Sequence, residues 1–321
     1  MSFFENDEVK LGTIEASEKL IKDLYIDLRE KINFWSTITH QTAQARMGYL
    51  GQHLASVVTG YKGGGSGARG KDLILPEGSY AEIKTCYRVD QLGSCKNCKS
   101  TVLPVEDTCP VCGSTDINRN DDSKWLIGIR NEDEFKHILD PKFYYLVLFE
   151  FAEIGQDNSI IASIWRVDPK VPGFALAMID YYSIIRAGSL SKAPFNLWPH
   201  QLKFYLMRPV LIYKSVITTS NTIETKLFPG MGKEELEKLP APEVYYRATN
   251  INDQVLKKLC NYIGIEYNGE KKLDILNDIY KNSKIDYVKF IDFFAKSLYE
   301  DRISPYIEGL PSEILNIINK F

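Results

Sequence analysis

Residues 72-DLILPEGSYAEIKT-85 carry a pattern from which much of the fold can be predicted. The segments 71–75 and 80–86 are short, apolar or β-branched in part, and bounded by turn residues, which is typical of strands. Between them, residues 76–78 read Pro-Glu-Gly, a common turn sequence. The pattern therefore predicts a β-hairpin.

Charged side chains of this hairpin are expected to converge at one end of a sheet. Side chains alternate along a strand, so Glu82 and Lys84 share a face while Ile83 points into the core. The hairpin also brings Asp72 close to Glu82. Asp72, Glu82 and the Ile83 carbonyl offer oxygen ligands for Mg²⁺, which lowers the pKa of a bound water. Lys84 is placed to orient that water and to stabilise developing charge.

These residues favour a catalytic site for phosphodiester hydrolysis. The alternative is a solvated Glu–Lys ion pair on an exposed strand, because a Glu-x-Lys sequence alone is common. A loop with five glycines, 62-KGGGSGARG-70, precedes Asp72 and would let the backbone approach DNA phosphates closely.

Apolar periodicity predicts the remaining elements. The predicted helices are 14–33, 43–58, 131–139 (capped by Asn131), 174–187, 252–263, 271–281, 284–299 and 311–320. The predicted strands are 125–129, 143–151, 160–167 and one or two within 204–217. Residues 218–250 lack strong periodicity and are expected to form a connection. We expect a nuclease core at 1–235 and a C-terminal helical module at 236–321, which would serve dimerisation or DNA recognition.

Composition excludes several classes of protein. Of the 321 residues, 44% are hydrophobic and 25% are charged, which excludes disorder along the whole chain. The net charge of −3 excludes a wholly basic nucleic-acid coat protein. Neither a membrane-spanning run nor a secretory signal is visible, so we expect a cytoplasmic protein without a membrane partner.

Four cysteines have the spacing of a tetrahedral zinc site: Cys95-x2-Cys98-x10-Cys109-x2-Cys112. Gly113 follows the second pair and permits a tight turn. Four thiolates leave no open position for substrate, so the zinc would be structural and would replace a core in an insertion at about 87–118. The alternatives are an iron–sulfur site or a redox pair.

Asp72 and Glu82-Ile83-Lys84 together resemble the motif of the PD-(D/E)XK nuclease superfamily, with Lys71 where the motif name has Pro. More narrowly, the chain resembles the MamI-like group of type II restriction endonucleases. The resembling stretches, between about 30 and 130, are 35-WSTITHQTAQARMGYLGQHLASVVTG-60, 67-GARGKDL-73, 82-EIKTCYRVDQLGSC-95 and 121-DDSKWLI-127. Residues 140–321 carry no such resemblance.

The resemblance implies an α/β (α+β) fold: a restriction-endonuclease-like mixed sheet flanked by helices, with a four-cysteine zinc-ribbon insertion and a C-terminal helical module. Members place a helix, the hairpin and a parallel strand in that order, which fits 43–58, 71–86 and 143–151. Many members carry a Glu on the first helix, where this chain has Gln52, a supporting residue without negative charge. The resemblance also implies a homodimer that cuts a specific duplex site, paired in the cell with a DNA methyltransferase.

Basic and amide side chains are candidates for contact with DNA. Lysine contacts phosphates, while Arg and Gln also bond to guanine or adenine edges. The candidates are Arg46, Lys62, Arg69 and Lys71 around the hairpin, and Arg88, Gln91, Lys96, Lys99 and Lys124 in the ribbon and its stem. The alternatives are a solvated basic face and a ribbon that is only a structural clip.

The sequence thus favours a Mg²⁺-dependent, type II site-specific endonuclease of a restriction-modification system. One alternative is a structure-specific or repair nuclease of the same fold. Another is a non-enzymatic zinc-ribbon DNA-binding protein in which Glu82 and Lys84 are surface charges. The absence of a G-x-x-x-x-G-K-[ST] motif disfavours nucleotide-driven translocation.

Overall fold

A computed structural model provides the structure of the chain. The residues it describes are 9–41, 48–65, 71–89, 91–103, 106–119, 123–153, 157–190, 193–231, 253–269, 271–272, 274–275 and 287–319. The chain divides into two compact units. The sheet unit comprises Met1–Trp125, Phe143–Arg166 and Val210–Glu234, and the helical unit comprises Leu126–Lys142, Val167–Pro209 and Glu235–Phe321.

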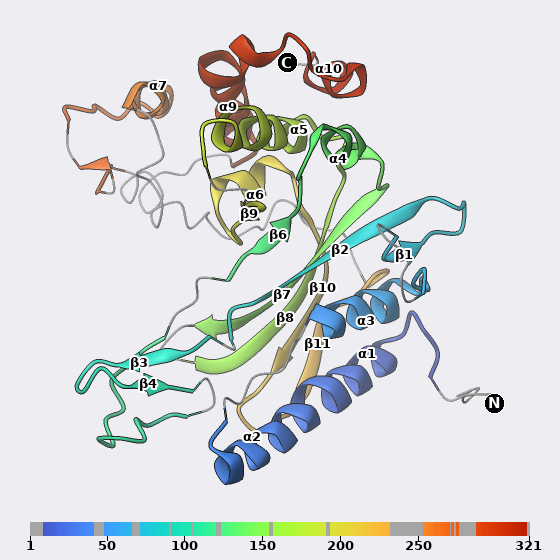
Figure 1. The fold of residues 1–321 in the computed structure, drawn as a ribbon, viewed down its shortest axis with the longest axis vertical. Coiled ribbons are helices and arrows are strands. Elements are labelled where there is room, and N and C mark those ends of the chain that lie inside the picture. Colours follow the sequence, from blue (N-terminus) through green and yellow to red (C-terminus); the bar gives the residue numbers. More distant parts are fainter. Residues whose placement is uncertain are drawn as a thin grey trace. The chain divides into compact units, whose positions relative to one another are not determined.

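A six-stranded mixed sheet forms the centre of the sheet unit, in the order β1-β2-β7-β8-β10-β11 (Figure 1). Its strands are β1 (Leu73–Ile74), β2 (Tyr80–Tyr87), β7 (Phe143–Glu153), β8 (Asp157–Val167), β10 (Val210–Ile217) and β11 (Ile223–Leu227). β1 pairs with β2 in the antiparallel sense, and β2 pairs with β7 in the parallel sense. The predicted hairpin and the predicted parallel strand are therefore confirmed.

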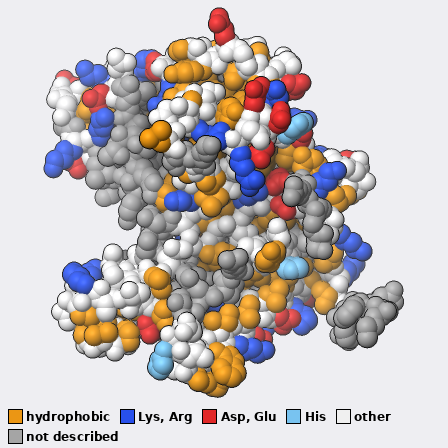
Figure 2. All heavy atoms as spheres, viewed as in Figure 1, with side chains coloured by type: hydrophobic (Ala, Val, Ile, Leu, Met, Phe, Trp, Pro, Cys, Tyr) orange, Lys and Arg blue, Asp and Glu red, His pale blue; other side chains and the backbone are white. Residues whose placement is uncertain are grey.

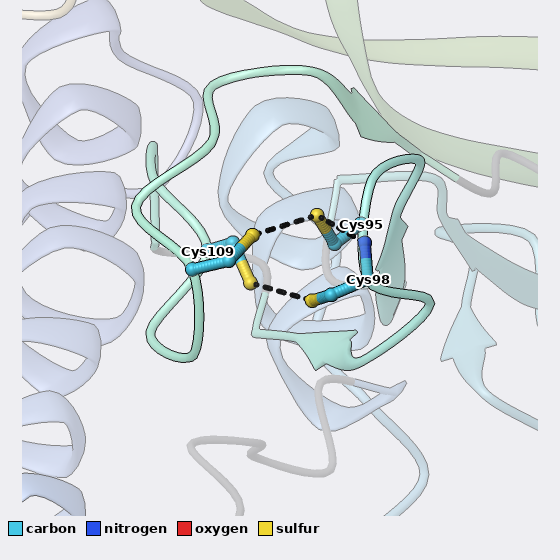
Figure 3. Close-up of side chains that lie close together, drawn as sticks. Cys95, Cys98 and Cys109 are labelled. Atoms are coloured by element: carbon cyan, nitrogen blue, oxygen red, sulfur yellow. Dashed lines mark hydrogen bonds between the residues drawn. The ribbon is translucent and has the colours of Figure 1, made fainter.

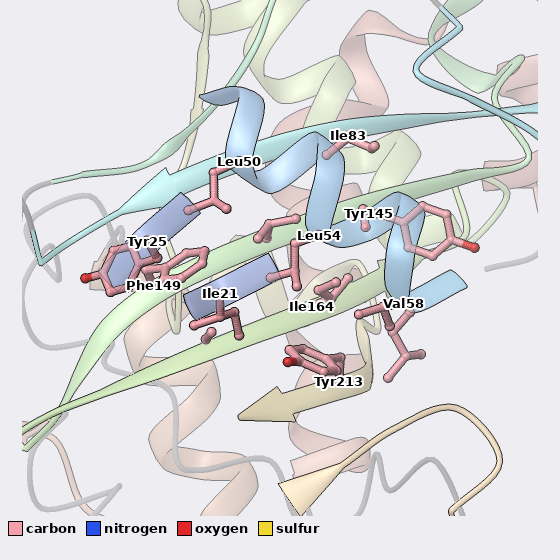
Figure 4. Packing of buried hydrophobic residues seen from close by; sticks show 14 of the residues in the cluster. Ile21, Tyr25, Leu50, Leu54, Val58, Ile83, Tyr145, Phe149, Ile164 and Tyr213 are labelled. Carbon is pink, nitrogen blue, oxygen red and sulfur yellow. The ribbon is translucent and has the colours of Figure 1, made fainter. Parts of the chain in front are cut away.

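Helices cover one face of this sheet (Figure 1). They are α1 (Ile14–Ile21), a π-helical segment (Lys22–Asp27), α2 (Leu28–Thr39) and α3 (Gly48–Thr59). The Thr13 hydroxyl caps α1 by accepting a hydrogen bond from the Ala16 N–H at 3.2 Å. Apolar stripes of α1 and α3, such as Ile21 and Leu54, pack onto Ile83 and neighbouring sheet residues (Figure 4). This packing fixes α3 over β2.

The apolar side chains of α2 lie largely outside the core. None of its residues is buried, and Phe34 and Trp35 are each 60% exposed. In Figure 2 an apolar patch lies at the lower end of the molecule, where Figure 1 places α2. α2 therefore contributes less to the core than α1 and α3 do.

A small three-stranded sheet in the order β4-β3-β5 forms the ribbon that follows β2. Its strands are β3 (Gly93–Cys95), β4 (Thr101–Val102) and β5 (Ile117–Asn118). Among its described residues, the buried apolar cluster consists of Cys95, Val102 and Cys109, with Ile117 packed against it. So small a cluster cannot stabilise an independent fold by burial alone.

In the part that the structure describes, the helical unit contains short helices and a two-stranded sheet, β6-β9. Its elements include β6 (Trp125–Ile127, which begins at the last residue of the sheet unit), α4 (Glu132–Lys136), a 3₁₀ turn (His137–Leu139), α5 (Pro172–Ile179), a π-helical segment (Asp180–Arg186), β9 (Phe195–Leu197) and α6 (Leu202–Leu206). The C-terminal elements are α7 (Asp253–Ile263), α9 (Tyr287–Leu298), a π-helical segment (Tyr299–Ile303), a 3₁₀ turn (Ser304–Tyr306) and α10 (Ser312–Ile318). The predicted cap is confirmed, since Asn131 Oδ1 accepts from the Glu134 N–H at 2.8 Å.

One sequence prediction is confirmed in part, and another is wrong. Residues 204–217 contain one strand, β10, as predicted, but α6 extends to Leu206 and takes the start of this range. Residues 218–250 are not merely a connection, because β11 pairs with β10 across a turn in which Asn221 has a φ of 60°. β11 is an edge strand without a fully buried residue, so it produces no apolar run in the sequence.

The mixed α/β fold with a four-cysteine cluster and C-terminal helices agrees with the predicted class. The domain boundary at 235/236 stays a prediction; residues 126–142 and 167–209 cluster with 235–321 in the helical unit. Among the described residues, the helices are all too short or too polar to cross a membrane.

Candidate active site and four-cysteine metal centre

The β1–β2 hairpin sets Asp72 directly across from Glu82. Leu73 pairs with Ala81 and Ile74 with Tyr80, so one further step of the same register places Asp72 opposite Glu82. Residues directly opposite on antiparallel strands have Cβ atoms about 5 Å apart. The hairpin register alone therefore brings the two carboxylates together.

Backbone and side-chain donors hold the Asp72 carboxylate from two sides. The Ile83 N–H donates to Asp72 Oδ2 at 2.8 Å. The Gln52 amide on α3 donates to Asp72 Oδ1 at 3.2 Å. Because the N–H and C=O of a strand residue in a ladder point to the same side, the Ile83 carbonyl is directed to this edge as well. The structure thus brings Asp72, Gln52 and the Ile83 backbone together, as expected.

Glu82 and Lys84 form an ion pair on the same face of β2. Lys84 Nζ lies 2.9 Å from Glu82 Oε2, and the two side chains are only 26% and 15% exposed. β11 carries a second Glu-x-Lys pair, Glu224 and Lys226, whose side chains are 64% and 46% exposed. The residue opposite Glu224 is Val216 rather than an acid. The pair on β2 therefore differs from a solvated surface pair of identical spacing.

The pKa of Asp72 is raised above its ordinary value. Burial is the largest cause, and the negative charge of Glu82 acts in the same direction, while the Ile83 N–H and Lys84 oppose it. A carboxylate that is costly to ionise beside a second carboxylate gains from a cation placed between them. The electrostatics of the site therefore favour a divalent metal ion.

Two of the predicted DNA-contacting lysines lie beside the hairpin. The Lys62 carbonyl accepts a hydrogen bond from the Ile74 N–H at 3.0 Å, so the start of the glycine loop runs along β1. A Cβ at Gly63 would lie 3.2 Å from the Asp72 carbonyl oxygen. The Lys71 ammonium lies 5.7 Å from the centre of the Tyr80 ring. Arg46 and Arg69 lie outside the described residues.

The four predicted metal-binding cysteines converge in the ribbon (Figure 3). Their Sγ atoms all lie within 4.8 Å of one another, with 3.5 Å between Cys95 and Cys112 and between Cys98 and Cys109. Four sulfurs around a tetrahedral Zn²⁺ with bonds of about 2.3 Å lie about 3.8 Å apart. The donor set and its spacing fit a tetrahedral metal ion.

Each Cys-x-x-Cys pair is followed by a residue whose backbone is left-handed. Gly113 follows Cys112 with a φ of 70°, as its sequence predicts, and Lys99 follows Cys98 with a φ of 63°. In each turn, the N–H of this residue donates at 2.9 Å to the carbonyl of the first cysteine of the pair, as Lys99 does to Cys95. Glycine adopts this conformation freely, but a lysine is strained there.

Ser100 is a site residue that sequence reasoning did not identify. Its hydroxyl lies 3.0 Å from the sulfurs of both Cys98 and Cys109. The Ser100 hydrogen bond is the main cause that lowers the pKa of the Cys109 thiol, to about 6. Ser100 thus stabilises the thiolate form that binds metal. Nothing in the Cys spacing points to it.

The stem of the ribbon is attached firmly to the sheet. Arg88 is buried and lies 3.9 Å from Glu150, so in this position its guanidinium is not presented to solvent. The Gln91 amide donates to Ser123 Oγ at 2.6 Å and so joins the two segments that form the stem. The Trp125 indole donates to the Val147 carbonyl at 2.8 Å. DNA contacts by Arg88 and Gln91 stay predictions.

Lys96 and Lys99 extend from the first cysteine turn. Lys96 is ion-paired with Asp116 at 2.7 Å, and both side chains are exposed. The Lys99 ammonium donates to the Lys96 carbonyl at 2.9 Å. Lys124 is half-buried in the stem. Phosphate contact by these three lysines also stays a prediction.

The fold and these two sites define a mixed α/β protein with a carboxylate–lysine cluster on a sheet hairpin and a four-cysteine metal centre. Residues 34–245 match the MamI restriction endonuclease family, and the chain belongs to that family. It is 37% identical over 85 residues to the type II restriction enzyme MamI from Microbacterium ammoniaphilum. That match covers 25% of this chain and 26% of MamI. No solved structure matches the chain.

The family match confirms the resemblance over residues 30–130 and extends it. Its C-terminal limit, residue 245, lies far beyond the cysteine ribbon and includes β7, β8, β10 and β11. Beyond residue 140 the sequence alone shows no usable resemblance. The whole six-stranded sheet therefore falls within the family match.

We expect Asp72→Asn to leave the protein at least as stable as the wild type at neutral pH without added Mg²⁺. Because the folded-state pKa of Asp72 is raised, ionising it costs the folded state free energy as the pH rises through that pKa. Asn removes this charge, and its Oδ1 still accepts from the Ile83 N–H. The advantage should shrink as the pH falls below the pKa of Asp72 and vanish below the ordinary pKa of an aspartate. Thermal unfolding across this pH range measures it.

Asp23→Asn, which removes an exposed carboxylate on the π-helical segment Lys22–Asp27, is the control and should show no such gain. A clear loss of stability in Asp72→Asn at neutral pH would contradict the electrostatic account of the site.

We expect Lys99→Gly to strengthen metal binding by the ribbon and Gly113→Ala to weaken it. A left-handed non-glycine residue costs about 1 kcal/mol, and a Cβ at Gly113 meets no atom within 4 Å, so the change tests backbone strain alone. Competition titration with Co²⁺ or Zn²⁺ measures both affinities. Equal affinities for the two variants and the wild type would show that the strain argument is wrong.

Proposed function

We propose that this protein is a Mg²⁺-dependent type II restriction endonuclease of the PD-(D/E)XK superfamily, which hydrolyses phosphodiester bonds at specific sites in double-stranded DNA. The observation that carries the proposal is the half-buried group of Asp72, Glu82 and Lys84 on one hairpin of a chain from a restriction endonuclease family. The name of MamI, a type II restriction enzyme, supports the same activity.

The mechanism assigns one task to each side chain. Asp72, Glu82 and the Ile83 carbonyl would hold Mg²⁺, which when bound neutralises the scissile phosphate and acidifies water. Lys84 would orient the attacking water and stabilise the developing charge on the phosphate. Gln52 keeps Asp72 in place through its amide N–H. The glycine loop and Lys62 would contact the DNA backbone beside the hairpin.

The four-cysteine centre would hold Zn²⁺ in a structural role. Four thiolates fill a tetrahedral shell, so the ion has no position for a substrate or a water. The ribbon has almost no apolar core of its own, and metal binding would supply the missing folding free energy.

In the cell, the enzyme would act in a restriction-modification system. We propose a homodimer in the cytoplasm in which each subunit cuts one strand, because a two-fold dimer matches a palindromic site. A partner DNA methyltransferase would protect the host sites.

We expect the purified protein to cut long duplex DNA into discrete fragments with Mg²⁺, and Lys84→Ala to lower the rate at least about a hundredfold. The matched control is Lys226→Ala, which removes the lysine of the exposed Glu-x-Lys pair on β11 and should cut at the wild-type rate. Agarose gels of unmethylated and methylated phage DNA, with Mg²⁺ or without it, give the result.

The outcomes separate the proposed activity from its alternatives. Cutting of branched or flapped DNA without discrete duplex fragments would favour a structure-specific or repair nuclease of the same fold. Binding without cutting on every substrate would favour a non-enzymatic zinc-ribbon DNA-binding protein.

We further propose that the ribbon and its stem contact DNA near the cut. Lys96 and Lys99 are exposed beside the metal centre, and the ribbon continues directly from the strand that carries Glu82 and Lys84. The Trp125 indole at the end of the stem donates a hydrogen bond to β7, so the base of the ribbon is held against the sheet. Arg88, Gln91 and Lys124 are the further candidates at its base.

The double change Lys96→Ala/Lys99→Ala is expected to weaken DNA binding about equally for all sequences. Each lost phosphate contact lowers the slope of log affinity against log salt by about 0.9. Gln91→Ala should instead relax the sequence preference if its amide reads a base. Fluorescence anisotropy over a salt series measures both, with Lys226→Ala as control. Unchanged slopes would contradict DNA contact by Lys96 and Lys99 and would indicate that the ribbon has only a structural role.

A further inference from the structure

Helix α3 approaches the proposed catalytic strand β2 very closely where Gly51 meets Thr85. A Cβ added to Gly51 would lie 2.0 Å from Thr85 Oγ1, 2.6 Å from Thr85 Cγ2 and 2.8 Å from Thr85 Cβ. These distances are far below ordinary van der Waals contact, so no residue other than glycine fits without movement. The Thr85 hydroxyl also donates to the Gly48 carbonyl at 3.3 Å. Thr85 therefore makes both a steric and a polar contact with α3.

This contact lies next to the proposed catalytic residues on both elements. Gln52 follows Gly51 on α3, and Lys84 precedes Thr85 on β2. The Gln52–Asp72 hydrogen bond is 3.2 Å long, at the long end of the normal range. A small displacement of α3 away from β2 would break it. The depth at which α3 sits on the strand thus decides whether Gln52 reaches the site.

We infer that Gly51 and Thr85 are positioning residues that set the depth of α3 and so hold Gln52 against Asp72. The inference rests on the proposed nuclease activity. An alanine at position 51 must move α3 by more than about 1 Å to reach normal contact with Thr85. Misplacement of a catalytic group by about 1 Å costs up to about a hundredfold in rate. No motif in the sequence indicates this contact, because it joins residues 34 positions apart.

The test is a double-mutant cycle of Gly51→Ala and Thr85→Ala. Gly51→Ala should lower kcat at least tenfold, leave KM for duplex DNA within threefold, and weaken Mg²⁺ binding measured by calorimetry on the free protein. Thr85→Ala removes the atoms at 2.0 and 2.6 Å and leaves only the Cβ at 2.8 Å, so Gly51→Ala/Thr85→Ala should recover part of the rate that Gly51→Ala loses. A steric contact predicts this non-additivity.

Gly48→Ala is the matched control on the same helix. A Cβ at Gly48 meets no atom within 4 Å, and the change keeps the carbonyl that accepts from Thr85. It should cut at the wild-type rate. The inference is overturned if Gly51→Ala cuts as fast as Gly48→Ala, or if the double variant stays as slow as Gly51→Ala.

Thr85→Ser keeps the test decisive if Gly51→Ala does not fold. Ser retains the hydrogen bond to Gly48 and should keep the wild-type kcat, whereas Thr85→Ala should lower kcat severalfold at unchanged KM. Equal kcat values for these two variants would overturn the inference. A wild-type protein that cuts no duplex DNA refutes the proposed function instead, and the calorimetric Mg²⁺ affinities of Gly51→Ala and Gly48→Ala then decide the positioning role.

Discussion

Two carboxylates set opposite each other on a tight hairpin impose the main constraint on this structure. The register that pairs Leu73 with Ala81 forces Asp72 and Glu82 together, and burial raises the cost of ionising Asp72. The fold offsets that cost with three groups from two elements. The Ile83 N–H comes from the strand itself, the Gln52 amide from α3, and the Lys84 ammonium from the same strand face. A metal ion would be the strongest further compensation.

β2 connects this constraint to the rest of the sheet unit. Its parallel pairing with β7 and the packing of α3 make it an interior strand, which keeps the site from slipping in register. The strand then leads into the ribbon, where the stacked rings of Tyr87 and Phe149, 4.7 Å apart, anchor the exit. The strand that carries Glu82 and Lys84 therefore also anchors the point where the chain leaves for the ribbon.

The predictable parts of this protein are those encoded locally. The hairpin, the cysteine turns and the long helices depend on residues a few positions apart, and the carboxylate cluster follows from hairpin register. A short apolar run does not by itself distinguish a helix from a strand. Residues 204–217 divide into α6 and β10, because Arg208, with a φ of 47°, and Pro209 separate two buried segments that look alike in the sequence. β11 was missed because an edge strand with half-exposed side chains lacks an apolar run.

The parts that could not be predicted are contacts between distant segments. Gly51 in the sequence is one small residue in an ordinary amphipathic helix, and only the crossing of α3 over β2 makes it necessary. The same holds for Glu82–Lys84 and Glu224–Lys226, which have identical spacing. What distinguishes them is the residue opposite, Asp72 in one case and Val216 in the other, together with burial. The capacity of a Glu-x-Lys pair to bind a metal ion therefore depends on strand pairing. The pair has this capacity only where the fold places a second carboxylate opposite the Glu.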